Sequence, residues 1–194
     1  MRKKSHISLA MHIVDSLNVR ELDKHRKAFY IGSILPDCKP SFLTTKHEFS
    51  GTISMLHEKI QEMTIEYDAN QCSERSFIMD LGQVLHYVAD YFTFPHNMTY
   101  DGTLRDHCIY EKELKHSLRA YIKNGDALKA YSPATGIDTP EALFRFIDKA
   151  HKEYLKFKRS VEEDCMYIVR VCHQVAEAIM NLFLKEKYSH YSFA

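Results

Sequence analysis

The sequence is poor in residues that interrupt secondary structure, with only six glycines and five prolines among 194 residues. Long segments therefore run unbroken, and in several of them apolar residues recur at three- and four-residue intervals, the helical period. No alternating pattern typical of a strand extends beyond a few residues. We therefore predict an all-α fold, with helices over the ranges 5–18, 21–33, 45–68, 74–93, 104–123, 139–156 and 160–187.

Start signals support three of these helices. Ser73 precedes a glutamate and an apolar run, Thr139 precedes a proline at the first helical position, and Ser160 precedes acidic residues. The range 160–187 is apolar around much of its circumference, which predicts the central helix of the core. A chain of this length is expected to form one domain over residues 1–194, a multi-helix bundle.

Long apolar runs and paired cysteines are also missing. No stretch approaches the roughly 20 apolar residues that cross a bilayer, and the N-terminal segment is broken by His6, His12 and Asp15, unlike a signal peptide. The five cysteines are odd in number and form no Cys-x-x-Cys pair, which is typical of reduced thiols. We therefore expect a soluble, cytoplasmic protein without a disulfide framework.

The chain has no net charge either, because 26 basic side chains balance 26 acidic ones. No global field then draws the protein to nucleic acid or to an anionic membrane. Any anionic substrate has to be attracted locally.

Histidine is abundant, and the segment HYVADYFTFPH places His86 and Asp90 four residues apart, on one face of a helix. Such a pair is common by chance, but His107 and Glu111 repeat the spacing on the next predicted helix, and His96 lies between the two pairs. Imidazole and carboxylate donors without thiolate suit zinc in a catalytic site.

Further candidates lie upstream. Asp37 follows a predicted helix in a turn, where an ordinary turn-forming role is the alternative, and His47 begins the next helix. His6 and His12 lie about 240 degrees apart around a helix, so only one of them easily faces the site. Cys108 is about 100 degrees from its neighbour His107, and we interpret it as a packing residue.

Taken in order, the segments SHISLAMHIVDSL, GSILPD, KHEF, LGQVLHYVADYFTFPHN and HCIYE resemble the bacterial zinc-dependent phospholipase C family, over residues 6 to about 115. The resemblance implies an all-helical enzyme that hydrolyses the phosphodiester of phospholipids with a metal-activated water. It implies Asp37 as the catalytic base. The implied zinc ligands are Asp37, His47, His86 and Asp90 for one ion, Asp90 and His6 for a second, and His96, His107 and Glu111 for a third.

The sequence departs from this family in one respect above all. Secreted members bind zinc through the amino group and carbonyl oxygen of an N-terminal tryptophan, together with the early histidine that His6 matches, and this chain contains no tryptophan. The Met1 amino group is the candidate substitute, so we expect two or three zinc ions. We expect no C-terminal lipid-binding domain, a phospholipid or small phosphodiester substrate, membrane contact that is transient at most, and no stable nucleic-acid partner.

Two alternatives remain open. The related zinc-dependent single-strand nucleases typically end their ligand set with His-x-x-x-Asp, whereas this chain has glutamate at position 111. A non-catalytic metal-binding helical protein is the other alternative. The aromatic residues around the motif fit either a substrate pocket or the core: Tyr91, Phe92, Phe94 and Tyr100.

Overall fold

The computed structural model describes residues 1–38, 48–65, 67, 72–156 and 160–189, and every regular element within them is a helix, which confirms the predicted all-α fold. None of the described helices combines the length and apolar character needed to cross a membrane. The elements are α1 (Lys3–Leu17), α2 (Arg20–Lys24), α3 (Arg26–Gly32), η1 (Pro36–Cys38), α4 (Phe49–Thr64), α5 (Glu74–Tyr91), η3 (Phe94–His96), α6 (Leu104–Lys123), α7 (Asp126–Lys129), α8 (Pro140–Tyr154) and α9 (Val161–Ser189).

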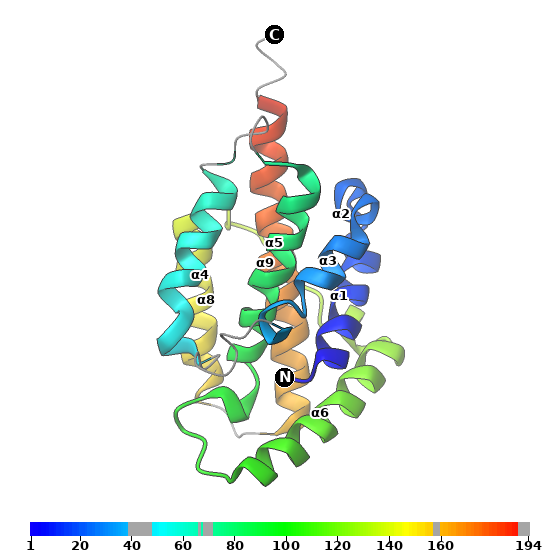
Figure 1. Ribbon diagram of the computed structural model, residues 1–194, viewed down its shortest axis with the longest axis vertical. Coiled ribbons are helices and arrows are strands. Elements are labelled where there is room, and N and C mark those ends of the chain that lie inside the picture. Colours follow the sequence, from blue (N-terminus) through cyan, green and yellow to red (C-terminus); the bar gives the residue numbers. More distant parts are fainter. Residues whose placement is uncertain (39–47, 66, 68–71, 157–159, 190–194) are drawn as a thin grey trace.

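Helix α9 runs through the middle of the bundle beside α5, with α4 and α8 along one side and α1 to α3 along the other (Figure 1). Helix α6 packs against both α9 and α1. Side chains of α9 such as Ile168, Val175 and Phe183 are fully buried. The prediction of a central core helix in this range is therefore confirmed.

The predicted helix starts are present. The side chains of Ser73, Thr139 and Ser160 each accept a hydrogen bond from the backbone N–H three residues later, at 3.1, 3.1 and 3.2 Å. Pro140 occupies the first position of α8, where its missing N–H removes no helical hydrogen bond. These caps fix where α5, α8 and α9 begin.

Two boundaries differ from the prediction. The range 21–33 is not one helix, because His25 adopts a non-helical conformation (φ −112°, ψ 23°) that separates α2 from α3. The range 45–68 contains the shorter α4, although its first residues lie outside the described part of the chain. The sequence reading also missed a capping box, in which Thr103 and Asp106 satisfy each other's backbone N–H groups at the start of α6.

Helices α3 and α5 touch through two glycines. A Cβ atom at Gly82 would lie 2.4 Å from the carbonyl oxygen of Phe29, and one at Gly32 would lie 2.0 Å from that of Met79. Neither distance leaves room for a side chain, so both positions require glycine. His86 lies one turn after Gly82, and the close contact therefore brings the end of α3 to this histidine.

We expect a Gly82→Ala substitution to lower the free energy of unfolding by more than about 3 kcal/mol. Overpacking a core typically costs about 1 to 3 kcal/mol, and here the obstructing atoms belong to backbone that cannot rotate away. Urea denaturation measures the change. In the control Gly51→Ala, on the exposed surface of α4, stability should stay the same or rise by up to about 1 kcal/mol. Equal stability of the Gly82 variant and the unmodified protein would contradict the close helix contact.

Candidate metal centre

Ligand-type side chains from five elements converge between α1, α5 and α6. Six of them form two clusters of three, and within each cluster the donor atoms lie within 4.8 Å of one another. The seventh, Asp37 of η1, lies beside the first cluster, and His47 lies outside the described residues. The inner cluster consists of His6, His86 and Asp90, and the outer cluster of His96, His107 and Glu111.

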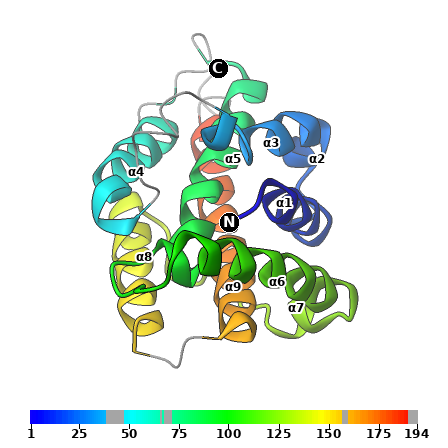
Figure 2. The ribbon, with the colours of Figure 1, turned by 60° about the horizontal axis from the view of Figure 1, so that its bottom comes forward.

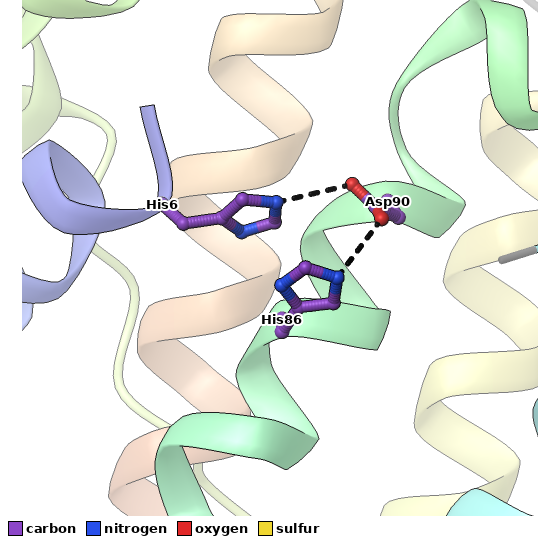
Figure 3. A group of neighbouring side chains, drawn as sticks. All are labelled: His6, His86 and Asp90. Carbon is purple, nitrogen blue, oxygen red and sulfur yellow. Dashed lines mark ion pairs between the residues drawn. The ribbon is translucent and has the colours of Figure 1, made fainter. Parts of the chain in front are cut away.

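The inner cluster is buried, with all three side chains at most 1 % exposed. Figure 3 shows the carboxylate of Asp90 beside the two imidazoles, with one oxygen facing each ring: His6 Nε2 lies 3.4 Å from Oδ1 and His86 Nε2 3.4 Å from Oδ2. The two rings stack with their centroids 4.0 Å apart. Of the pair considered in the sequence, it is thus His6 rather than His12 that faces the site.

The backbone at the C-terminal cap of α3 orients one of these imidazoles. His86 Nδ1 lies 2.9 Å from the carbonyl oxygen of Ser33, and only a protonated Nδ1 can donate to a carbonyl. The Nε2 atom then carries the lone pair and faces Asp90 and Asp37. Metal-binding histidines usually have such an outer partner, which fixes the tautomer and the ring orientation.

The donor spacing fits zinc. A tetrahedral ion with bonds of about 2.0 to 2.1 Å separates its ligand atoms by roughly 3.3 Å. The imidazole-to-carboxylate separations are 3.4 Å for both pairs of the inner cluster, and 3.3 and 3.2 Å for the two pairs of the outer cluster. In addition, His6 Nε2 is buried without a hydrogen-bond partner in the described part of the chain. A buried donor atom in this state is what a metal ion would satisfy.

The amino group of Met1 links the two clusters. It donates a hydrogen bond to Asp90 Oδ1 at 2.7 Å, and lies 2.8 Å from His96 Nε2 and 3.1 Å from Glu111 Oε1. Residue 1 is buried, with 4 % of its surface exposed. A positive charge therefore lies among the carboxylates, at the position where the sequence reading places a substitute for the tryptophan amine.

The electrostatics of the site favour ionised carboxylates at Asp90 and Glu111 and a neutral imidazole at His86. Burial favours a raised pKa for Asp90, but the Met1 ammonium and the nearby histidines hold it well below its usual value. The pKa of Glu111 is likewise lowered despite burial, by His107, His96 and the same ammonium. Burial and its neighbour His6 lower the pKa of His86. These are the protonation states that bind metal.

An open pocket of about 980 Å³ gives access to the outer cluster and to Asp37. The carboxylate of Asp37 is 10 % exposed, and its Oδ1 lies 3.6 Å from His86 Nε2. Basic and apolar side chains line the same pocket, among them Arg2, Lys3, Met98, Tyr100 and Leu104.

The turn that carries His96 is held by a residue whose role the sequence did not reveal. Asp164 is fully buried and accepts hydrogen bonds from the backbone N–H of Phe94 at 2.8 Å, from Tyr110 at 2.9 Å and from Tyr154 at 2.6 Å. Burial raises its pKa to about 6, although these hydrogen bonds act in the opposite direction. From the sequence, Asp164 is interpreted only as one of the acids that favour a helix N-terminus. In the structure its side chain points inward, where it ties η3 to α6 and α8.

The residues around the motif divide between core and pocket. Tyr91 and Phe92 are fully buried in the core, whereas Tyr100 lines the pocket. Phe94 is half-buried and packs edge-on against Tyr100. The interpretation of Cys108 as packing is wrong, because its side chain is exposed and lines the pocket. Its 100-degree offset from His107 turns it away from the side of α6 that carries the buried Leu114 and Leu118, and toward solvent.

A family model described as zinc dependent phospholipase C matches residues 5–161. The match spans more than half of the chain and contains both clusters and Asp37. Comparison with curated proteins and with solved structures gives no match.

Proposed function

Because the chain belongs to the zinc-dependent phospholipase C family, we propose that it hydrolyses the phosphodiester bond of a phospholipid at the site between α1, α5 and α6. The observation that carries the proposal is the inner cluster, where His6 Nε2 is buried beside Asp90 and finds no hydrogen-bond partner among the described residues. A zinc ion bound at Nε2 would satisfy this buried atom.

The inner cluster supplies ligands to two ions and the outer cluster to a third, and two or three ions are proposed. The Met1 amino group would join the second ion once it has lost its proton, because it lies 2.7 Å from Asp90 Oδ1, the oxygen that also faces His6. The proposed ligands are Asp37, His47, His86 and Asp90 for the first ion, Asp90 and His6 for the second, and His96, His107 and Glu111 for the third.

Zinc, when bound, supplies positive charge that polarises a phosphoryl oxygen and lowers the pKa of water toward neutrality. Asp37 is proposed as the general base, because its carboxylate borders the pocket next to His86 and can accept the proton of the attacking water. The Ser33 carbonyl keeps the His86 imidazole in one orientation throughout. Arg2 and Lys3 at the pocket rim attract the phosphate.

The proposal predicts zinc-dependent turnover that is selective for a lipid-type phosphodiester. The purified protein is assayed for zinc content, and for hydrolysis of a chromogenic phosphocholine ester, bis-nitrophenyl phosphate and single-stranded DNA. Chelation should abolish turnover, and zinc should restore it, because the ions carry the charge stabilisation.

The three assays separate the alternatives. Preferred cleavage of single-stranded DNA would identify a nuclease. Bound zinc with no turnover of any substrate would identify a non-catalytic metal protein, whose coordination is complete without an open position. Either result would overturn the proposed phospholipase activity.

A further inference from the structure

The charges of this neutral chain are unevenly placed, and basic residues gather on one face. No acid occurs in the first 14 residues, while the start of α1 carries three consecutive basic side chains. Five more lie on α6. We call these eight residues the basic face: Arg2, Lys3, Lys4, Arg105, Lys112, Lys115, Arg119 and Lys123.

The five basic residues of α6 form a stripe. At 100 degrees per residue they fall within an arc of about 80 degrees. None of the acids of α6 falls in this arc. Asp106 is engaged in the capping box, Glu111 belongs to the outer cluster, and Glu113 lies about 80 degrees beyond the edge of the stripe.

Contacts join the stripe to the start of α1. Arg2 donates a hydrogen bond to the carbonyl oxygen of Cys108 at 2.9 Å, and Arg119 donates one to Ser8 at 3.4 Å. Partial burial and the positive charges around it lower the pKa of Lys115. Figure 2 shows α6 next to the start of α1 on the side of the molecule that faces the viewer. The eight side chains therefore lie on one continuous surface.

The described part of the chain does not neutralise the basic face. None of its eight residues forms an ion pair with a residue in the described part of the chain, although surface lysines elsewhere do, such as Lys24, Lys59 and Lys129. Like charges held together repel one another, and an anionic partner relieves that repulsion.

Apolar side chains project beside these charges. Met98 is 81 % exposed, Leu104 79 % and Ile109 53 %. Met98 and Leu104 line the pocket together with Arg2 and Lys3 of the basic face. The surface thus presents exposed apolar residues at the mouth of the pocket and a field of positive charge next to it.

We propose that this surface docks the protein reversibly on a bilayer of anionic phospholipids, with the pocket mouth toward the head groups. Basic side chains near an anionic bilayer strengthen binding by roughly fivefold each, and exposed apolar side chains enter the boundary between head groups and acyl chains. Single-stranded nucleic acid fits less well, because the stripe carries no aromatic platform for bases. The choice of a lipid partner rests on the proposed function, whereas the binding itself needs no turnover.

The test measures sedimentation of the full chain with vesicles of phosphatidylcholine alone, or of phosphatidylcholine mixed with phosphatidylglycerol. Binding is expected only to the anionic vesicles, and should fall as salt rises from about 0.1 to about 1 M. In a triple variant with Lys112, Lys115 and Arg119 each changed to glutamine, the partition coefficient should drop on the order of a hundredfold.

A matched variant controls for net charge. Arg145, Lys149 and Lys152 lie exposed on α8, which Figure 2 shows on the other side of α9 from α6. Changing these three residues to glutamine removes the same charge, and vesicle binding should fall less than threefold. Thermal melting of both variants checks that each is folded.

The outcomes distinguish the docking surface from the proposed activity. Hydrolysis of a soluble short-chain phosphodiester should be unchanged in the α6 variant, because the three residues lie outside the pocket and both clusters. Vesicle binding without any hydrolysis would overturn the proposed function and leave the docking surface intact. Equal vesicle binding by both triple variants would overturn the docking proposal. The proposal would also be overturned if the unmodified protein bound a single-stranded oligonucleotide more tightly than anionic vesicles and only the α6 variant lost that binding.

Discussion

An Asp90→Asn variant is expected to lose bound zinc and nearly all hydrolytic activity. The Asp90 carboxylate lies 3.4 Å from both inner imidazoles and accepts a hydrogen bond from the Met1 ammonium at 2.7 Å. The asparagine amide has the same shape but lacks the negative charge on which the contacts with the imidazoles and with the Met1 ammonium depend. Loss of a residue that only orients a metal ligand lowers metal affinity or activity about 10- to 100-fold. We expect a larger loss here because the Asp90 side chain is itself a proposed ligand. Metal analysis and turnover of the chromogenic substrate measure the effect.

A second aspartate on the same helix provides the control. Asp80 lies ten residues before Asp90 on α5 and pairs with Lys59 at 2.9 Å on the surface. The change Asp80→Asn is chemically identical, and it should leave zinc content and activity intact, since a surface ion pair is worth only about 0 to 1 kcal/mol. Full zinc content and activity in the Asp90 variant would remove Asp90 from the proposed site.

Extending the chain before residue 1 is expected to destabilise the zinc-free protein strongly. Any added residue converts the Met1 ammonium into an amide, and leaves Asp90 and Glu111 without the charge that lies 2.7 and 3.1 Å away. Breaking a buried ion pair typically costs about 3 to 5 kcal/mol. A Gly-Ser extension should therefore lower the melting temperature after chelation, and should also lower the zinc content of the site.

Zinc titration distinguishes the effect of the lost positive charge from the effect of the added residues. If the lost positive charge causes the instability, zinc should raise the melting temperature of the extended protein more than that of the original chain. A version whose extension is removed by a specific protease, so that Met1 is again first, should regain the original stability. An extended protein with unchanged melting temperature and zinc content would show that the amino group has no role at the site.

The sequence predicted local relationships well. Four-residue spacing on a helix brings His86 to Asp90 at 3.4 Å and His107 to Glu111 at 3.2 Å, because the two positions lie one turn apart whatever the rest of the fold does. The helix caps at Ser73 and Thr139 are equally local and are confirmed. The roles of these side chains as zinc ligands stay predictions.

Helical spacing and capping patterns could not predict contacts between distant segments of the chain. The partner of His86 is a backbone carbonyl 53 residues earlier, and the carboxylate of Asp164 reaches Phe94 across 70 residues. No periodicity encodes either contact, because both depend on how the helices pack. The two glycines between α3 and α5 were visible in the sequence, but only the packed structure shows that they let Ser33 approach His86.

Net charge leaves open how the charges are distributed. A balance of 26 basic and 26 acidic residues predicted that no global field draws the protein to a membrane, and this total says nothing about where the charges lie. The stripe on α6 becomes visible once helical positions are plotted on one face. It joins the start of α1 only through tertiary contacts such as that between Arg2 and Cys108.

The buried amino group also sets an order of events during synthesis. Its contacts reach residues 89 and 95 positions away, so they form only after α5 and η3 have left the ribosome. Until then the amino group of a chain that begins at Met1 is accessible to aminopeptidases, and afterwards it is buried. In such a chain, any removal of Met1 would therefore have to precede the folding of α5 and η3 onto the N-terminus.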